Sequence, residues 1–308
     1  MTRTGLRAGI LAAVAALVTA VTATPATAAQ GAVVHHLGGG AAEYWTPEKM
    51  RAATPLDGLP ADVQRVVGDV RAALPRLIPS GSQASTGDPW TGGGAVTQTA
   101  GRVFFTFDGS PASCSGDAVT SANRSVVITA GHCVKYQGSW HTDWIFVPGY
   151  DNGAAPHGEW PATATLTTPQ WEADEDLNYD VGAAVVAPQG GRYLTDAVGG
   201  QGIAFNQPRG QRMHSFGYPA EPPYDGSELT YCSGRTFDDP IGTGDLGLRC
   251  DMTGGSSGGP WFAEFDESTG IGVQGSVNSF GYTFLPGVMF GPYFGADVED
   301  LYDAAASR

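Results

Sequence analysis

The sequence predicts an all-β protein that ends in a helix. The 308-residue chain contains 45 glycines and 21 prolines, and such a composition favours many turns over long helices. Between about 101 and 278, short apolar runs alternate with turn residues, at a spacing that suits two antiparallel barrels or a sandwich. Near the C-terminus Val298, Leu301 and Ala305 recur at helical intervals, so a closing helix is expected over about 296–306.

The expected strands fall into two series. The first series comprises 101–107, 112–121, 124–133, 142–150, 160–168 and 180–188. The second series comprises 212–220, 228–236, 247–252, 260–265 and 270–278. Each run is bounded by glycine, proline, asparagine, aspartate or serine, the residues that punctuate strands.

Residues 1–28 predict a secretory signal peptide. Arg3 and Arg7 precede an uncharged apolar run, and Ala26 and Ala28 form an A-x-A step, so cleavage is expected just after Ala28. The apolar run is shorter than the roughly 20 residues that a membrane span needs. We therefore expect a secreted, extracellular protein with no membrane association after the signal peptide is removed.

Residues 29–94 predict a pro-segment and linker. Apolar residues recur at helical spacing within 59–77, and a loose Ser/Gly-rich stretch follows over 80–94. A small helical unit followed by a flexible tether suggests a segment that is removed by cleavage. The alternative is a mobile N-terminal extension that the mature protein keeps. The main domain is expected over 95–308.

Cysteine content and charge narrow the class of protein. Export to an oxidising compartment predicts two disulfides among the four cysteines. Three pairings are possible, and the expected one, Cys114–Cys133 with Cys232–Cys250, closes the shortest loops. The formal charge of −15 argues against nucleic-acid binding and against adhesion to anionic membranes. We expect a monomer.

A glycine-rich stretch, TGGSSGGP over 253–260, contains Ser257 in the pattern G-x-S-x-G. A serine hydroxyl is a weak nucleophile until a neighbouring base takes its proton. After the expected pro-segment the histidines are His132, His141, His157 and His214, and all of them precede Ser257. This order excludes an α/β-hydrolase, in which the histidine follows the serine.

His132 is the best candidate for the base, and Asp180 for the carboxylate that orients it. His132 stands in TAGHC at the end of an apolar strand, beside Cys133, and a rigid strand end with a covalent anchor suits a base that must keep one orientation. Asp180 opens an apolar, interior run, as a buried orienting carboxylate should. Asp174 and Asp176 lie in a solvated acidic stretch, with calcium binding as the alternative.

The motifs TAGHC, YDVGAAVV and GGSSGGP, in this order, resemble the trypsin-like (chymotrypsin-fold) serine peptidases over about 95–308. FGYPA at 216–220 and GGSSGGPWF are most similar to the bacterial secreted glutamyl-endopeptidase-like branch. The resemblance implies two six-stranded antiparallel β-barrels, at about 100–190 and 191–295, with a catalytic cleft between them. It also implies a triad of His132, Asp180 and Ser257, and an oxyanion hole made by the N–H groups of Gly255 and Ser257. No cofactor or metal is expected.

Two departures from that family concern activation. Ser256 stands where animal members carry an aspartate that pairs with a newly freed N-terminus, and no IVGG-like terminus is present. Removal of the pro-segment is therefore expected to act differently, by uncovering the cleft.

The resemblance also suggests residues of the substrate pocket. Asp251, six residues before Ser257, is expected at the pocket floor, and Ser276 on the strand that pairs with extended substrate. His214 is interpreted as an ordinary strand histidine. The expected function is a secreted endopeptidase acting on polypeptides; the alternatives are an inactive binding module with the same fold, or an esterase that uses the same serine.

Overall fold

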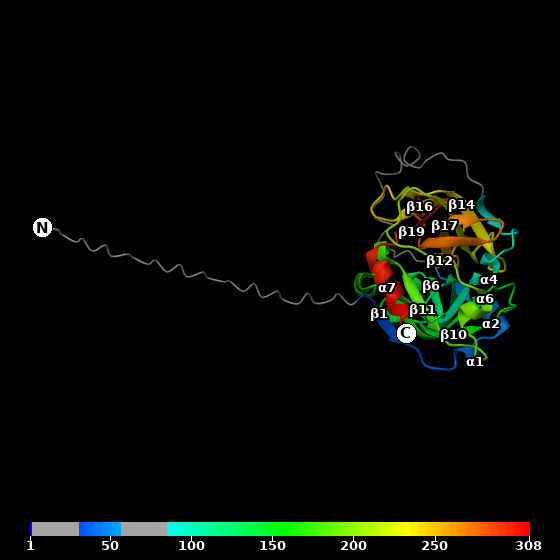
Figure 1. Ribbon diagram of the computed structural model, residues 1–308. Coiled ribbons are helices and arrows are strands. Elements are labelled where there is room, and N and C mark those ends of the chain that lie inside the picture. The colour runs from blue at the N-terminus through cyan, green and yellow to red at the C-terminus, as the bar shows by residue number, and fades with distance from the viewer. Residues whose placement is uncertain (2–30, 57–84) are drawn as a thin grey trace.

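The structure, a computed structural model, describes residues 1, 31–56 and 85–308. Within these residues the chain forms two β units that lie against each other, and helix α7 (Ala296–Ala306) runs along their side (Figure 1). The expected signal peptide, apart from Met1, and the expected helix over 59–77 lie outside the described residues. None of the described helices has the length and apolar character needed to cross a membrane.

The first unit is a closed barrel of six antiparallel strands. In order around the barrel these are β4 (Ala100–Phe107), β5 (Ser110–Val119), β6 (Val126–Thr129), β11 (Gly182–Val186), β10 (Trp160–Thr167) and β9 (Thr142–Pro148). The barrel closes because β9 pairs with both β4 and β10. The six strands match the six expected runs between 101 and 188, so the first expected barrel, hereafter barrel one, is confirmed.

The second unit, hereafter barrel two, is built from two sheets. The larger has the order β12 (Gly202–Ile203), β18 (Ile271–Val277), β17 (Pro260–Asp266), β13 (Arg212–Gly217), β14 (Thr230–Arg235) and β3 (Ser85–Pro89). The smaller joins β15 (Phe237–Asp238), β16 (Leu246–Arg249) and β19 (Val288–Gly291). β13, β14, β16, β17 and β18 match the expected second series, while the very short β12 and β15 carry no period-2 signal that could have predicted them.

Short elements complete the connections. They are α4 (Val96–Thr99), α5 (Pro169–Asp174), α6 (Leu194–Val198), two 3₁₀ turns (Gly131–Cys133 and Leu177–Tyr179), and the hairpin of β7 (Lys135–Tyr136) and β8 (Ser139–Trp140). Thr168 caps α5 by accepting a hydrogen bond from the Trp171 N–H, which satisfies one of the free donors of the first turn.

Helix α7 fastens the end of the chain to barrel one. Its apolar face places Val298, Leu301 and Ala305 in the same core cluster as β11, as the helical spacing of these residues predicted. The strand β11 (GAAVV) is buried along its whole length, because barrel one covers one face and α7 the other. A helix that follows barrel two in sequence thus returns to barrel one.

Residues 31–56 pack on barrel one. β1 (Val33–His36) extends the sheet beside β10, α1 (Ala41–Tyr44) and α2 (Pro47–Ala52) follow, and β2 (Thr54–Pro55) pairs in parallel with β5. Trp45 and Met50 are buried in a cluster with Phe104, Ile145 and Val147. The described part of the expected pro-segment is therefore an integral layer of this structure.

The expected flexible linker over 80–94 needs correction from residue 85 onward. Ser85–Pro89 forms strand β3, which pairs with β14. Trp90 packs its ring edge-to-face against Phe216, Tyr231 and Phe265, at centroid distances of 5.1 to 5.6 Å. The burial of one large aromatic ring outweighs the flexibility that the glycines and serines suggested, so the paired region begins before residue 95.

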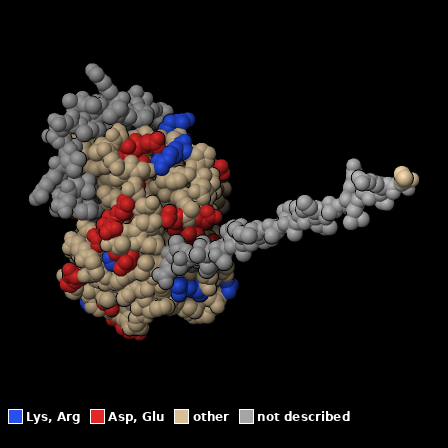
Figure 2. Space-filling view, turned by 90° about the vertical axis from the view of Figure 1, so that its left-hand side faces the viewer, with Lys and Arg blue, Asp and Glu red and all other residues tan. Residues whose placement is uncertain are grey.

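Both expected disulfides are present. Cys114 is bonded to Cys133 and Cys232 to Cys250. The first bond ties β5 to the turn that carries His132, and the second ties β14 to the segment leading to the glycine-rich loop. Acidic side chains occupy more of the face shown in Figure 2 than basic ones, as the net charge of −15 requires.

Candidate active site

His132 and Asp180 form a buried pair held by two hydrogen bonds. Asp180 Oδ2 lies 2.8 Å from His132 Nδ1, and Asp180 Oδ1 accepts a 2.8 Å bond from the backbone N–H of His132. Both side chains are completely buried. Since a carboxylate accepts at Nδ1, that nitrogen carries the hydrogen, and Nε2 is left with a free lone pair that can take a proton.

The local folding of each residue explains its position. The 3₁₀ turn Gly131–Cys133 follows β6 and is pinned by the disulfide at Cys133. Asp180 follows the 3₁₀ turn Leu177–Tyr179. Asp176 caps this turn by accepting a hydrogen bond from the Asn178 N–H. Both segments belong to barrel one. Asp176 is thus a half-buried capping residue, whereas Asp174 is exposed to solvent as expected.

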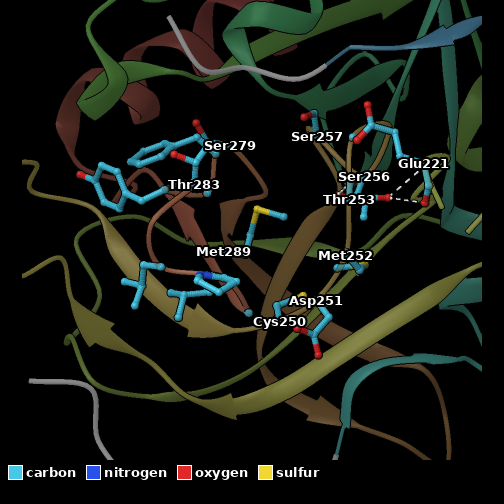
Figure 3. Close-up of a pocket in the computed structure, with 18 residues that line it drawn as sticks. Glu221, Cys250, Asp251, Met252, Thr253, Ser256, Ser257, Ser279, Thr283 and Met289 are labelled. Carbon is cyan, nitrogen blue, oxygen red and sulfur yellow. Dashed lines mark hydrogen bonds between the residues drawn. The ribbon is translucent and has the colours of Figure 1, made fainter. Parts of the chain in front are cut away.

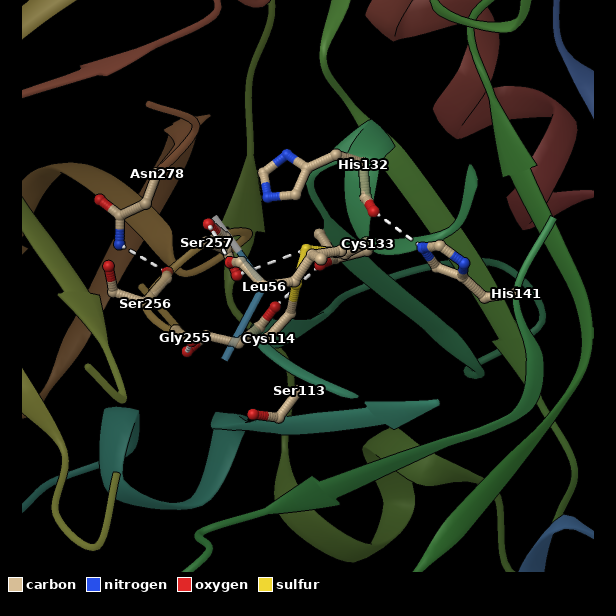
Figure 4. Close-up of a disulfide and its surroundings, with 12 residues drawn as sticks. Leu56, Ser113, Cys114, His132, Cys133, His141, Gly255, Ser256, Ser257 and Asn278 are labelled. Carbon is tan, nitrogen blue, oxygen red and sulfur yellow. Dashed lines mark hydrogen bonds between the residues drawn. A yellow bond between two sulfur atoms is a disulfide. The ribbon is translucent and has the colours of Figure 1, made fainter. Parts of the chain in front are cut away.

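Ser257 approaches the turn that carries His132 from barrel two. Its carbonyl oxygen accepts a 2.7 Å bond from the N–H of Ser115 and lies 3.7 Å from the sulfur of Cys133, the neighbour of His132. The Ser257 hydroxyl, however, donates to the carbonyl oxygen of Leu56 at 3.3 Å. Nε2 of His132 is buried and has no hydrogen-bond partner among the described residues. Figure 4 shows Leu56 next to Ser257, beside the Cys114–Cys133 bond.

The glycines around Ser257 are required by positive φ angles and by the close approach of neighbouring backbone. Gly255 has φ +92° and Gly258 has φ +80°, a region that residues with a Cβ rarely adopt. A Cβ at Gly258 would lie 2.1 Å from Thr129 Oγ1, and one at Gly255 would lie 2.9 Å from the Tyr218 carbonyl oxygen. The loop therefore needs glycine at both positions.

The backbone of this loop leaves two N–H groups free to bind a ligand. The carbonyl of Gly254 accepts from the Ala220 N–H at 2.8 Å, and the carbonyl of Ser256 accepts from the Asn278 side chain at 3.0 Å. Because each peptide unit is planar and trans, the N–H of Gly255 and the N–H of Ser257 point the opposite way. Neither donates to another group among the described residues, so both can serve as oxyanion-hole donors.

Asn278 holds the loop in this conformation. Its amide nitrogen donates to the carbonyls of Phe216 and Ser256, and its amide oxygen accepts from Ser215 Oγ and from the indole of Trp261. The residue is completely buried, with all four hydrogen bonds between 2.6 and 3.0 Å. An amide is the one side chain that can both donate twice and accept twice here. Figure 4 shows the bond to Ser256.

Ser279 is a site residue that the sequence analysis missed. Its hydroxyl donates to Oδ2 of Asp180, and it also lines the cavity beside Ser257. Ser276, the residue expected there, is instead buried and donates to the carbonyl of Pro292 at 2.8 Å. Strand β18 ends at Val277, so the segment that borders the cavity begins two residues after the strand. The difference of three residues between Ser276 and Ser279 could have been predicted only by knowing that β18 ends at Val277.

A cavity of about 330 Å³ opens next to Ser257. Its lining comes from three segments and from Glu221. The segments are Cys250–Ser257, of which Gly255 is not in the lining, Ser279–Thr283 and Leu285–Met289. Met252 and Met289 lie in its middle, and Asp251 lies at the end away from Ser257 (Figure 3). Asp251 is exposed. Among the described residues that line it, none is histidine, lysine or arginine.

Two further histidines, His214 and His141, make contacts outside the cavity. His214 lies on β13 and contacts Glu267 at 3.0 Å, outside the cavity, as its interpretation as a strand histidine requires. His141 stacks on Phe105 at 4.2 Å and donates from Nε2 to the carbonyl of His132 at 2.9 Å. Burial lowers the pKa of His141 to about 3, so this side chain stays neutral while it supports the backbone of His132.

Comparison with solved structures identifies the class. The protease Anisep from Arthrobacter nicotinovorans is 43% identical, with a TM-score of 0.66 over 73% of this chain and 99% of its own. The thermostable serine protease AL20 from an extremophilic microorganism is 44% identical, with a TM-score of 0.66 over 69% of this chain and 99% of its own.

A Glu endopeptidase shares the fold at 19% identity, with a TM-score of 0.53 over 67% of this chain and 90% of its own. No family model matches, and no curated protein does. The chain belongs to the trypsin-like, chymotrypsin-fold serine proteases. It is accordingly a serine-type peptidase whose substrates are polypeptides.

Proposed function

We propose that this chain is a secreted serine endopeptidase that cleaves peptide bonds through Ser257, His132 and Asp180. The observation that supports this most strongly is the double hydrogen bond between His132 and Asp180, in a cleft that the Ser257 loop enters from the opposite barrel. Two free N–H groups beside the same serine provide the expected electrostatic stabilisation.

In the proposed reaction, Ser257 Oγ attacks the carbonyl carbon of the substrate while its proton passes to His132 Nε2. The negative charge that develops on the carbonyl oxygen is stabilised by the N–H groups of Gly255 and Ser257. The C–N bond then breaks, and the leaving amine takes the proton from His132. A water molecule repeats the sequence on the acyl-enzyme and releases the acid, while Asp180 stabilises the transient imidazolium.

Export and maturation are part of the proposal. The expected signal peptide over 1–28 and the two disulfides suit an oxidising, extracellular location. Anisep corresponds over nearly its whole length to 73% of this chain, and the remaining quarter or so equals the residues before Ser85 in size. Because β3 is paired with β14, we propose that the mature enzyme begins close to Ser85 and includes this strand.

The test is covalent labelling of the N-terminally processed protein with a fluorophosphonate, with the adduct mapped by peptide mass spectrometry. We expect one adduct, at Ser257, which His132→Ala abolishes. His214→Ala is the matched control, because His214 is a buried strand histidine outside the cavity, and labelling should persist in this variant.

The same experiment separates the alternatives. Folded, processed protein that never reacts would identify an inactive binding module. Protein that is labelled at Ser257 and hydrolyses activated esters, but leaves a library of unstructured peptides uncut, would be an esterase.

A further inference from the structure

Residues Thr54–Leu56 lie along the cleft and end at the nucleophile. β2 pairs in parallel with β5, with Thr54 opposite Ala112 and Pro55 opposite Ser113. The N–H of Leu56 then donates to the carbonyl of Ser113 at 3.0 Å, and the carbonyl of Leu56 accepts from Ser257 Oγ at 3.3 Å. The segment therefore binds one barrel by its backbone and the nucleophile by its last carbonyl.

The direction of this segment is opposite to that of a substrate. Among the described residues the cavity beside Ser257 is lined from barrel two, whereas β2 lies on barrel one. A substrate whose residue before the cut bond fills this cavity would place the residues after that bond on the other side of Ser257, toward barrel one. Here the residues that precede the Leu56 carbonyl pair with β5 on barrel one. The segment therefore runs in the direction opposite to such a substrate.

The Leu56 side chain does not fill the cavity either. It packs where two apolar clusters meet, one containing Cys114 and Cys133 and the other containing Tyr136. Acyl transfer to Ser257 would require the Leu56 side chain to fill the cavity while its carbonyl faces Ser257. This arrangement is not present.

The contact with Leu56 also keeps the nucleophile away from its base. The Ser257 hydroxyl proton is directed to the Leu56 carbonyl, while Nε2 of His132 stays without a partner among the described residues. A serine whose proton is not shared with the base is not activated for attack. Displacement of Leu56 would free the hydroxyl to turn toward His132.

The segment is held in place by strong anchors upstream. Trp45 is buried and its indole donates to the carbonyl of Asp143 at 2.6 Å, and Met50 is buried in the same cluster. Because these anchors belong to the same chain, they present Thr54–Leu56 to the cleft at a high effective concentration. Weak local contacts are thus sufficient to keep the site occupied.

We propose that the β5 edge at Ala112–Ser113, together with Ser257, is an inhibitory peptide-binding site. Its occupant is the segment Thr54–Leu56 of this chain, which runs opposite to a substrate. The segment blocks the cleft and keeps the Ser257 hydroxyl unreactive until it is displaced. This inference rests on the proposed role of Ser257 as nucleophile.

The test compares rates of fluorophosphonate labelling of the intact chain, with integrity checked by mass spectrometry in the same samples. Leu56→Pro removes the N–H that binds Ser113 and should raise the rate about tenfold, the effect of one lost hydrogen bond. Leu56→Ala keeps that N–H and should give a smaller rise. Glu43→Ala, an exposed position on α1, is the control and should match the wild-type chain, while the processed wild-type enzyme sets the uninhibited rate.

A second measurement covers the case in which Leu56→Pro does not fold. Acetyl-Ala-Thr-Pro-Leu-amide at millimolar concentration should slow labelling of the processed enzyme and remain uncut, whereas the peptide of reversed sequence should have no effect. Cleavage of the first peptide, or an intact wild-type chain that reacts as fast as the processed enzyme, would overturn the inference and leave the proposed function standing. Failure of every form to react, the processed enzyme included, would overturn both.

Discussion

The side-chain amide of Asn278 donates a 3.0 Å hydrogen bond to the carbonyl of Ser256, the residue directly before Ser257. This bond turns the Ser257 N–H toward the cleft, while the second donor hydrogen of Asn278 fixes the carbonyl of Phe216 on β13. The proposed oxyanion hole therefore depends on the side chain of a completely buried residue.

Asn278→Asp should lose both donor bonds while keeping the shape of the side chain. Leaving buried carbonyls unpaired and burying a carboxylate should reduce the free energy of unfolding by about 2 to 4 kcal/mol, and labelling of Ser257 should slow by at least about 100-fold. Urea unfolding and labelling rates measure the two effects. Asn152→Asp, at an exposed position, should change neither; equal losses in both variants would refute this role of Asn278.

Ser279→Ala should weaken the positioning of Asp180. The variant loses the hydroxyl that donates to Asp180 Oδ2, while the two bonds between Asp180 and His132 remain. We expect kcat/KM to fall about 3- to 10-fold, mainly through kcat. Ser276→Ala is the matched control, since that buried hydroxyl bonds Pro292 and its loss should leave kcat close to the wild-type value. A larger kinetic effect from Ser276→Ala would restore the expectation that Ser276 belongs to the site.

Asp251→Asn should change the preference for the residue that enters the cavity. The described lining contains the carboxylates of Asp251 and Glu221 and no cationic side chain, so substrates with aspartate or glutamate at that position should be cut poorly. Removing the exposed charge of Asp251 should raise kcat/KM for such substrates about 3- to 10-fold and lower it for arginine and lysine. Peptide-library cleavage measures the preference for acidic and for basic residues. An unchanged preference would show that Asp251 does not contact the residue that enters the cavity.

His141 makes stability fall as the solution becomes acidic. Burial lowers its pKa to about 3 in the folded protein, against about 6.5 in an unfolded chain. The unfolded state therefore binds more protons below about pH 6.5, and stability falls by up to about 1.4 kcal/mol per pH unit, or about 2 kcal/mol between pH 7 and pH 5. Urea unfolding in a Ser257→Ala background, which prevents self-digestion, measures this slope. His141→Gln should flatten it.

The sequence was sufficient to predict the strands of barrel one, most of barrel two, the C-terminal helix and both disulfides. Alternating or fully apolar runs bounded by turn residues carry that information locally, as Val126–Thr129 and Gly182–Val186 illustrate. His132, Asp180 and Ser257, the proposed triad, could be selected as candidates from the sequence because each stands in a distinctive motif next to such a run.

Other features depend on contacts that the local sequence does not encode. The choice between Ser276 and Ser279 is set by where β18 ends, and the pairing of Ser85–Pro89 with β14 is set by the burial of Trp90 in a distant aromatic cluster. The docking of residues 31–56 on barrel one likewise depends on Trp45 reaching Asp143, almost one hundred residues later. Period and composition cannot reveal partners at such separations.

The position of α7 has a consequence for heat inactivation. His132 and Asp180 belong to barrel one and Ser257 to barrel two, so their alignment requires that the barrels do not slide past each other. Helix α7 follows barrel two but is buried against β11, and Asn123 holds its end through the carbonyls of Ala305 and Arg308. Fraying of this helix on warming would release the end of the chain from barrel one. Peptidase activity should therefore be lost at temperatures where each barrel is still folded.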